Sequence, residues 1–265
     1  MIEIGISQIA FSIGPLDIRW YGIFVALAVT VLVAWILWQV KKGADIPYET
    51  VMTMALIGIP AGIIFARLMH VIDQWGYYSQ HPGQIIGGEG LTIYGAVLGA
   101  ALAIWIYSRF SKIKYAYVVD VVAPGIILAQ IIGRVGCLLN GCCYGTMTSL
   151  TWSISYTNPV SDAYGVMNVH PTQAYEIIFL GLLFGVMMLL KGRLKPDGSQ
   201  FLIYLMAYSL WRFGVDFIRD GTPFLFGLHQ AQVIAIIVAV ISAVLLIRLK
   251  VTWKRAETLE EAPVS

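Results

Sequence analysis

The sequence predicts an all-α protein that crosses a membrane about seven times. The chain of 265 residues is 58% hydrophobic and only 12% charged, and its mean hydropathy is +0.78. It also contains long apolar runs, each close to the roughly 20 residues that a bilayer core requires. Ordinary soluble domains carry about 25% charged residues, so the composition argues against a soluble enzyme, a disordered chain and a coiled-coil rod.

The apolar runs define the expected helices in chain order. They cover residues 20–40, 50–72, 91–108, 116–134, 171–190, 199–219 and 226–248. The segment before the first run lacks a basic start and no small-residue cleavage site follows that run, so we expect a retained helix and not a signal peptide. We expect residues 1–249 to form a single membrane-embedded catalytic domain and residues 250–265 a polar cytoplasmic tail.

Basic residues are distributed unevenly between the two ends of the expected helices. Twelve of the 17 lie after the first, third, fifth and seventh runs. Because positively charged loops stay in the cytoplasm, the N-terminus is expected outside and the C-terminus in the cytoplasm. The basic residues on the outer side are all arginines: Arg19, Arg67, Arg134, Arg212 and Arg219.

The outer arginines predict an anion site at the outer leaflet. A guanidinium grips phosphate or carboxylate with two parallel hydrogen bonds, whereas the ammonium of Lys acts as a point charge. The alternative for Arg19 and Arg67 is that their side chains snorkel to the interface or pair with a carboxylate. The net charge of only +2 does not indicate a nucleic acid as a partner.

The sixth run contains YSLWRFGVDFIR, which places polar side chains on one helical face. These side chains are Tyr208, Arg212, Asp216 and Arg219. Charged residues within a membrane helix are costly, so they are expected to face the interior of the bundle and to be functional. A purely structural ion pair between Arg212 and Asp216 is the alternative.

The end of the fourth run reads GRVGCLLNGCCYG, in which glycines surround Arg134 and Asn140. Glycine lets the backbone approach a ligand closely, and exposed backbone amides can bind an anion beside Arg134. The last glycine of this segment is Gly145.

All three cysteines of the chain, Cys137, Cys142 and Cys143, lie in the same segment. Their C-x4-CC spacing is not that of a zinc site. Buried thiols or a short-range disulfide are therefore expected in preference to a catalytic cysteine, and we expect no metal and no cofactor.

The fifth run opens with HPTQAYE, which contains His170, Gln173 and Glu176. Gln173 and Glu176 are three residues apart and share a helical face. They are candidates for substrate binding, and hydrogen bonding between helices is the alternative. Glu176, or Asp120 deeper in the fourth run, could also pair with a buried arginine.

Pairs of glycines spaced by four residues occur within or near several runs. They are Gly58 and Gly62, Gly95 and Gly99, Gly141 and Gly145, and Gly181 and Gly185. This spacing permits close approach of helices in lipid, so we expect tight packing there.

Four motifs together resemble the prolipoprotein diacylglyceryl transferase family. In chain order they are the WYG at residues 20–22, the glycine-arginine segment, HPTQAYE and YSLWRFGVDFIR. The resemblance covers about residues 15–248. It implies a seven-helix enzyme of the bacterial plasma (inner) membrane, with its active site towards the outer leaflet. Such an enzyme moves the diacylglyceryl group of the membrane lipid phosphatidylglycerol to the lipobox cysteine of a prolipoprotein signal peptide. It forms a thioether, releases glycerol phosphate and begins lipoprotein maturation.

The resemblance also assigns individual residues. Tyr21 matches the tyrosine of the WYG motif, Arg134 the signature arginine, and Asn140 and Gly145 later signature positions. Tyr208 and Arg212 match the tyrosine and arginine of the sixth helix. Asp216 stands where relatives carry Glu, which keeps the carboxylate.

Two positions depart from the family pattern. Tyr94 occupies the place of a histidine often proposed as general base, and Cys137 that of an asparagine. Tyr94 could act as the base only if its pKa, normally about 10, were lowered by nearby arginines.

The expected roles of these residues follow from the charges of the reaction. Arg134 and Arg212 hold the phosphate, Asp216 orients Arg212, and Tyr21 and Tyr208 position the headgroup. The further candidates for substrate binding are Arg67, Asn140, Gly145, His170, Gln173, Glu176 and Arg219.

Two other functions remain open at this stage. One is a related membrane protein that binds or moves an anionic lipid, although the internal symmetry common in transporters is not visible. The other is a paralogous transferase with the same donor and a different acceptor.

Overall fold

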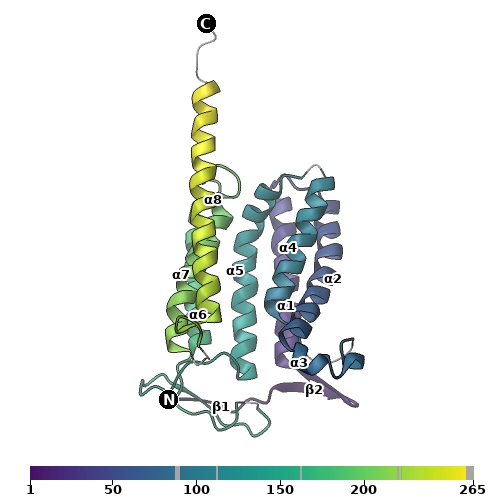
Figure 1. Ribbon diagram of the computed structural model, residues 1–265, viewed down its shortest axis with the longest axis vertical. Coiled ribbons are helices and arrows are strands. Elements are labelled where there is room, and N and C mark those ends of the chain that lie inside the picture. The colour runs from purple at the N-terminus through teal and green to yellow at the C-terminus, as the bar shows by residue number, and fades with distance from the viewer. Residues whose placement is uncertain (87–89, 112, 162, 220, 222, 261–265) are drawn as a thin grey trace. The chain divides into compact units, whose positions relative to one another are not determined.

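The computed structural model describes residues 1–86, 90–111, 113–161, 163–219, 221 and 223–260 (Figure 1). Side chains are described for these residues except at positions 16 and 254–260. The helices and strands, in chain order, are β1 (Ile2–Ile4), β2 (Ile9–Ile13), β3 (Leu16–Arg19), α1 (Trp20–Lys41), α2 (Tyr48–Asp73), α3 (Trp75–Tyr78), η1 (Pro82–Gln84), α4 (Ile93–Phe110), α5 (Tyr115–Asn140), β4 (Ile154–Tyr156), α6 (Thr172–Leu190), α7 (Ser199–Val215), η2 (Asp216–Ile218), β5 (Pro223–Leu225), β6 (Leu228–His229) and α8 (Gln230–Glu260).

The prediction of a mostly helical protein with seven spans is confirmed. Within the described ranges, seven helices are long and apolar enough to cross a membrane. They coincide with the seven predicted runs apart from their ends. The orientation of the two termini stays a prediction.

Two helices, α5 and α8, extend well beyond their predicted ends. α5 continues to Asn140, six residues past the predicted end, and stops where Gly141 adopts a φ of +72°. α8 continues to Glu260, so much of the expected polar tail is helical. Lys112 and residues 261–265, which entered the charge count and the tail prediction, lie outside the described residues.

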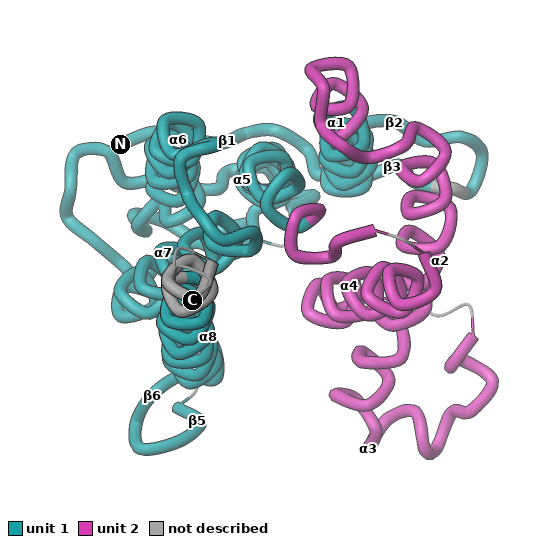
Figure 2. Tube along the Cα trace, turned by 90° about the horizontal axis from the view of Figure 1, so that it is seen from above, with its two compact units in different colours: residues 1–35, 119–265 teal, residues 36–118 magenta. Residues whose placement is uncertain are grey.

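The chain divides into two compact units (Figure 2). Unit 1 comprises residues 1–35 and 119–265, and unit 2 comprises residues 36–118. The expectation of a single catalytic domain stays a prediction.

The core of unit 1 lies between α5, α6 and α7. Its buried residues are Ala123, Ile127, Leu180, Leu183, Met187 and Tyr204. Asp120 of α5 accepts hydrogen bonds from the backbone N–H groups of Gly198 and Phe201, both at 2.7 Å, at the start of α7. A carboxylate is favourable there because it satisfies unpaired amides and complements the helix dipole. Asp120 therefore caps α7, and Arg134 pairs with Glu176 instead.

The connection between α5 and α6 folds into a small core of its own. Its strand β4 pairs in parallel with β1, with Ile2 opposite Ile154. Ile154, Tyr156, Ala163 and Val169 are buried together. This packing holds the segment that follows Asn140 beside the start of α6.

The turn between α7 and α8 brings distant residues together in unit 1. The short antiparallel pair β5–β6 reverses the chain, with Pro223 opposite His229. α7 and α8 then run side by side, as Figure 1 shows. Residues near the end of α7 consequently lie beside the start of α8.

In unit 2, α2 and α4 pack closely against each other. A Cβ atom at Gly95 would lie 2.3 Å from the carbonyl oxygen of Phe65, and one at Gly99 would lie 2.7 Å from that of Ala61. These two glycines confirm the predicted tight packing. At Gly181 and Gly185 no such neighbour lies within 4 Å among the described atoms, so the prediction was wrong for that pair.

Candidate active site

Glu176 joins three helices of unit 1. Its Oε1 atom lies 2.9 Å from Nη2 of Arg134 on α5 and accepts a 2.9 Å hydrogen bond from the Tyr208 hydroxyl on α7. Glu176 itself lies one turn into α6 and is buried. The carboxylate therefore fixes two of the side chains that the sequence analysis selected.

A second carboxylate, Asp216, forms a similar pair at the end of α7. Its Oδ1 atom lies 2.9 Å from Nη2 of Arg212, and its Oδ2 atom lies 2.9 Å from Nδ1 of His229. Asp216 is buried and both partners are mostly buried. The arrangement ties Arg212 to the first residues of α8.

The two carboxylate centres are linked along α7. Tyr208 and Arg212 are four residues apart, about one helical turn, and project from the same face. One turn of α7 therefore separates the hydroxyl bound to Glu176 from the guanidinium bound to Asp216.

Three buried polar atoms near these pairs have no hydrogen-bond partner among the described residues. They are Nη1 of Arg212, Oδ1 of Asn140 and Oε1 of Gln173. Buried polar groups are almost always paired, so each such atom calls for an explanation. The unpaired Nη1 of Arg212 is a donor on a cationic guanidinium and suits an anionic ligand, whereas the unpaired amide oxygens of Asn140 and Gln173 can accept hydrogen bonds from hydroxyl groups.

Arg134 also lies beside the cysteines. It interacts electrostatically with Cys137 and Cys143, and the Tyr21 hydroxyl interacts with Arg134 and all three thiols. α1 packs closely against α5 at Gly136, because a Cβ added there would lie 2.8 Å from Cβ of Phe24. The ring of Tyr21 also lies near this position. The structure thus places Tyr21 of α1 beside the end of α5. All three cysteines are free thiols.

The electrostatic environment differs between the two cysteines that follow α5. Hydrogen bonds from the Cys137 and Cys142 thiols, assisted by Arg219 and Arg134, hold the pKa of Cys143 below its usual range. Hydrogen bonds with the Cys137 and Cys143 thiols raise the pKa of the Cys142 thiol.

Gly145, His170 and Gln173 connect the glycine-rich segment to the start of α6. The backbone N–H of Gly145 donates to the His170 carbonyl at 2.8 Å, and Nε2 of Gln173 donates to the Cys142 carbonyl at 2.6 Å. A Cβ at Gly145 would lie 2.5 Å from the Ile218 carbonyl oxygen. These residues position the glycine-rich segment at the start of α6.

Asn140 and Arg219 border the same region. The backbone carbonyl of Asn140 accepts a 2.8 Å hydrogen bond from Nε2 of Gln8. Arg219 forms a β-bridge with Gly145, and its charge reaches Cys143.

Tyr94 and Arg67 belong to unit 2. Tyr94 is exposed in the first turn of α4. Arg67 donates to the carbonyls of Ile85 at 2.9 Å and Gly90 at 3.0 Å, and to a third carbonyl in the same connection. Arg67 therefore organises the connection between α3 and α4, which gives it a structural role.

His229 and Gln8 were missed as members of the site. His229 lies 13 residues from Asp216, so no helical spacing reveals the pair, and only the β5–β6 reversal creates it. Gln8 precedes the first span and is buried. A buried glutamine before an apolar run is a weak signal in sequence.

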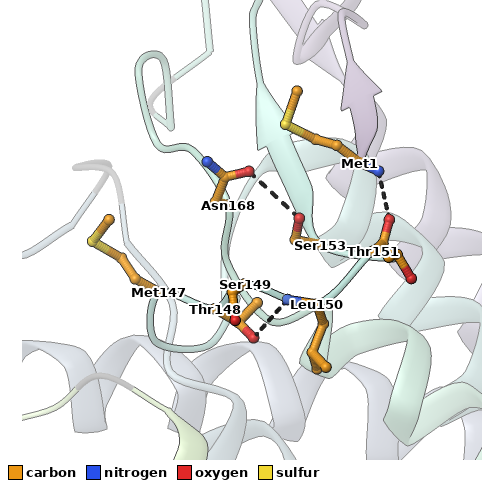
Figure 3. Close-up of a pocket in the computed structure, with 8 residues that line it drawn as sticks. All are labelled: Met1, Met147, Thr148, Ser149, Leu150, Thr151, Ser153 and Asn168. Carbon is orange, nitrogen blue, oxygen red and sulfur yellow. Dashed lines mark hydrogen bonds between the residues drawn. The ribbon is translucent and has the colours of Figure 1, made fainter.

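A separate open pocket lies at the start of unit 1 (Figure 3). It is lined by Met1, Met147, Thr148, Ser149, Leu150, Thr151, Ser153 and Asn168. The N-terminal ammonium donates to the Thr151 carbonyl there. The lining includes none of the predicted site residues, so we place the candidate site at the arginine pairs.

Comparison with known proteins gives consistent matches. Residues 8–248 match the family described as prolipoprotein diacylglyceryl transferase. A phosphatidylglycerol–prolipoprotein diacylglyceryl transferase of Dehalococcoides mccartyi is 55% identical over 238 residues, 89% of this chain and 91% of that protein. A protein of the same name from Symbiobacterium thermophilum is 36% identical over 249 residues, 91% of this chain and 92% of its own. Another, from Clostridioides difficile, is 35% identical over 233 residues, 87% of this chain and 90% of its own.

Proposed function

Because this chain belongs to the prolipoprotein diacylglyceryl transferase family, we propose that it transfers the diacylglyceryl group of phosphatidylglycerol to a prolipoprotein. The acceptor is the lipobox cysteine thiol of the signal peptide, and the products are a thioether and glycerol phosphate. This reaction is the first step of lipoprotein maturation. The chain is a multi-pass membrane protein, and we place it in the bacterial plasma (inner) membrane with its site towards the outer leaflet.

The observation that carries the proposal is the pair of buried arginine-carboxylate contacts. Arg134 and Arg212 are each held by one carboxylate, and Nη1 of Arg212 is buried without a partner among the described residues. With Arg219 close by, the arginines exceed the two paired carboxylates by one charge. That excess matches the single negative charge of a phosphodiester headgroup.

The reaction builds further negative charge on the leaving group. The acceptor sulfur attacks the glyceryl carbon, a C–S bond forms, and the C–O bond to phosphate breaks with its electron pair going to the phosphate oxygen. Preorganised guanidinium groups in a dry site stabilise this charge more than water can. We assign the phosphate to Arg134 and Arg212 and the orientation of Arg212 to Asp216.

The headgroup hydroxyls require neutral polar partners. Tyr21 and Tyr208 both interact with Arg134, the Tyr208 hydroxyl already donates to Glu176, and Asn140 ends the helix that carries Arg134. We assign headgroup positioning to these three side chains. Gly145, His170 and Gln173 fix the glycine-rich segment, and Arg219 contributes positive charge.

The acceptor thiol must lose its proton to attack well, because its unperturbed pKa is about 8.5. Tyr94, at the place of the family histidine, remains our candidate for the proton acceptor. The family chemistry uses no metal or cofactor, and the residues assigned above supply its charges without one.

The test is mass spectrometry of a lipobox peptide incubated with the protein in phosphatidylglycerol membranes. We expect a diacylglyceryl mass addition on the cysteine, lost in Arg134→Ala and Arg212→Ala. A matched control is Arg193→Ala, which removes an arginine from the connection between α6 and α7 and should leave the addition intact. A folded protein that never modifies the peptide would refute the proposal.

A transferase with another acceptor is the second candidate, because Tyr94 and Cys137 replace the histidine and asparagine of the family pattern. It predicts release of glycerol phosphate from phosphatidylglycerol in native membranes while the lipobox peptide stays unmodified. The same incubation distinguishes the two, since both products are measured.

A further inference from the structure

The three cysteines meet at one point of unit 1. The Sγ atoms of Cys137, Cys142 and Cys143 all lie within 4.8 Å of one another. All three are free thiols, and the chain contains no other cysteine. No role in the proposed transfer requires three thiols together, and the spacing in sequence did not predict their convergence.

The backbone around the thiols is fixed by local turns. Cys137 lies on the last turn of α5, and the backbone N–H of Cys142 donates to its carbonyl at 3.1 Å. Gly141 and Cys143 adopt positive φ angles of 72° and 66°. The left-handed region is unfavourable for a residue with a Cβ, so Cys143 is held there by its surroundings. The two turns bring Cys142 and Cys143 back towards Cys137.

Side chains from α6 hold the other end of this turn. The Thr172 hydroxyl donates to the Cys143 carbonyl at 2.6 Å, and Nε2 of Gln173 donates to the Cys142 carbonyl at 2.6 Å. The thiols are therefore clustered before any ligand arrives. A preformed cluster loses little conformational entropy when it binds an ion.

The cluster is accessible and lies in a positive environment. Cys137 is buried, while Cys142 and Cys143 are half-buried. Arg134 and Arg219 both interact with Cys143. Three thiolates around a monovalent cation carry two negative charges, and nearby positive charge lowers the cost of bringing them together.

We propose that Cys137, Cys142 and Cys143 form a three-thiolate site for a soft, thiophilic metal ion, with Cu(I) the best fit. Thiolates select soft ions over Mg²⁺ or Ca²⁺. Structural zinc sites are almost always four-coordinate, and in the described part of the chain no histidine or carboxylate joins this cluster. A trigonal ion with bonds of about 2.3 Å to sulfur would need sulfurs about 4 Å apart. The sequence analysis predicted no metal, so this proposal differs from that expectation. It does not depend on the proposed transferase function.

The test is an anaerobic titration of the purified, reduced full-length protein with Cu(I), in competition with a Cu(I)-selective chelator. We expect one equivalent to bind, a thiolate-to-metal charge-transfer band in the ultraviolet, and loss of all three thiols from reaction with a thiol reagent. Mg²⁺ should produce neither change. Because the chain has no other cysteine, every thiol signal comes from this cluster.

Single Cys→Ser variants of each position test the ligand set. Loss of a residue that only supports a metal ligand can weaken binding by about 100-fold. Loss of a direct ligand should cost at least as much, so we expect each variant to bind Cu(I) at least about 100-fold more weakly. Met147→Leu is the matched control, because it removes an exposed soft sulfur outside the cluster and should leave the affinity unchanged.

Two results on the wild-type protein would overturn the site, even if the variants fail to fold. One is complete transfer of Cu(I) to the chelator with three thiols still reactive. The other is a count of one thiol in the unfolded, metal-free protein before any reductant is added, because that count means that two of the cysteines form a disulfide.

Discussion

Nδ1 of His229 lies 2.9 Å from Oδ2 of Asp216, although the two residues belong to opposite sides of the turn between α7 and α8. The other oxygen of the same carboxylate holds Arg212. Asp216 thus has both of its oxygens engaged by positively polarised groups. The guanidinium of Arg212 is therefore oriented by a carboxylate that His229, the residue directly before α8, also contacts.

Replacing Asp216 tests whether this orientation matters for turnover. Asp216→Asn removes the charge that holds Arg212, and a misplacement of about 1 Å can cost about 100-fold in rate. We expect kcat to fall by about that factor while the protein stays folded. Asp216→Glu should recover most of the rate, because the family pattern places Glu there. Steady-state rates with lipobox peptide and phosphatidylglycerol measure both variants, and wild-type kcat in Asp216→Asn would contradict the assignment.

Arg134→Lys separates charge from shape at the other pair. A Lys ammonium preserves the positive charge beside Glu176 but loses the planar, two-donor grip on phosphate. Removal of one preorganised donor to a developing anion typically costs about 100- to 1,000-fold in rate, and we expect a loss in that range. Peptide lipidation measured by mass spectrometry provides the readout. Retention of wild-type turnover would remove Arg134 from the reaction.

Glu176→Gln addresses stability, because it leaves the mostly buried Arg134 without its carboxylate. Breaking a buried ion pair by removing one partner typically destabilises a protein by about 3 kcal/mol. Tyr208→Phe is the control, since it removes only a hydrogen bond to the same carboxylate and should cost about 1 kcal/mol. Denaturant unfolding in detergent micelles measures both. Equal losses for the two variants would show that the ion pair contributes no more than the hydrogen bond.

Much of the fold could be predicted from the sequence because a bilayer imposes a length and a polarity on every span. The seven runs correspond to α1, α2 and α4–α8. Helical periodicity predicted that Tyr208 and Arg212 share a face of α7. It also predicted the ion pair between Arg212 and Asp216, which the sequence analysis gave as the structural alternative. Pairing of a buried arginine with Glu176 was also anticipated.

The rest depended on turns, which apolar periodicity does not describe. His229 reaches Asp216 through the β5–β6 reversal, and the cysteines converge through positive φ angles at Gly141 and Cys143. The extension of α5 was missed because the predicted run ended at Arg134, and the glycines around it were interpreted as positions where the backbone approaches a ligand. Within a packed bundle, glycine at positions 133 and 136 is compatible with a continued helix.

The contacts of Cys143 predict how the thiols react with an alkylating reagent. A lowered pKa keeps a larger thiolate fraction at neutral pH, and the thiolate is the reactive form. Cys143 should therefore alkylate at neutral pH and below, whereas Cys142, whose pKa is raised, should react only under alkaline conditions. Peptide mapping of the metal-free protein after timed iodoacetamide exposure gives the rates. Faster alkylation of Cys142 than of Cys143 would refute the assigned order.

Gly145 offers a test of how tightly the glycine-rich segment is held. A Cβ there would lie 2.5 Å from the Ile218 carbonyl oxygen and 2.7 Å from Cβ of His170, so backbone on one side and a side chain on the other must move. Forcing such a shift typically costs about 1–3 kcal/mol, and we expect Gly145→Ala to destabilise unit 1 by that amount. Gly181→Ala is the matched control. No described atom beyond α6 itself approaches its Cβ within 4 Å, and alanine in a helix interior is favoured over glycine by about 1 kcal/mol. Denaturant midpoints should therefore move in opposite directions for the two variants. An unchanged midpoint for Gly145→Ala would show that the segment can move to accommodate the Cβ. The close approach to Ile218 would then not explain the glycine at this position.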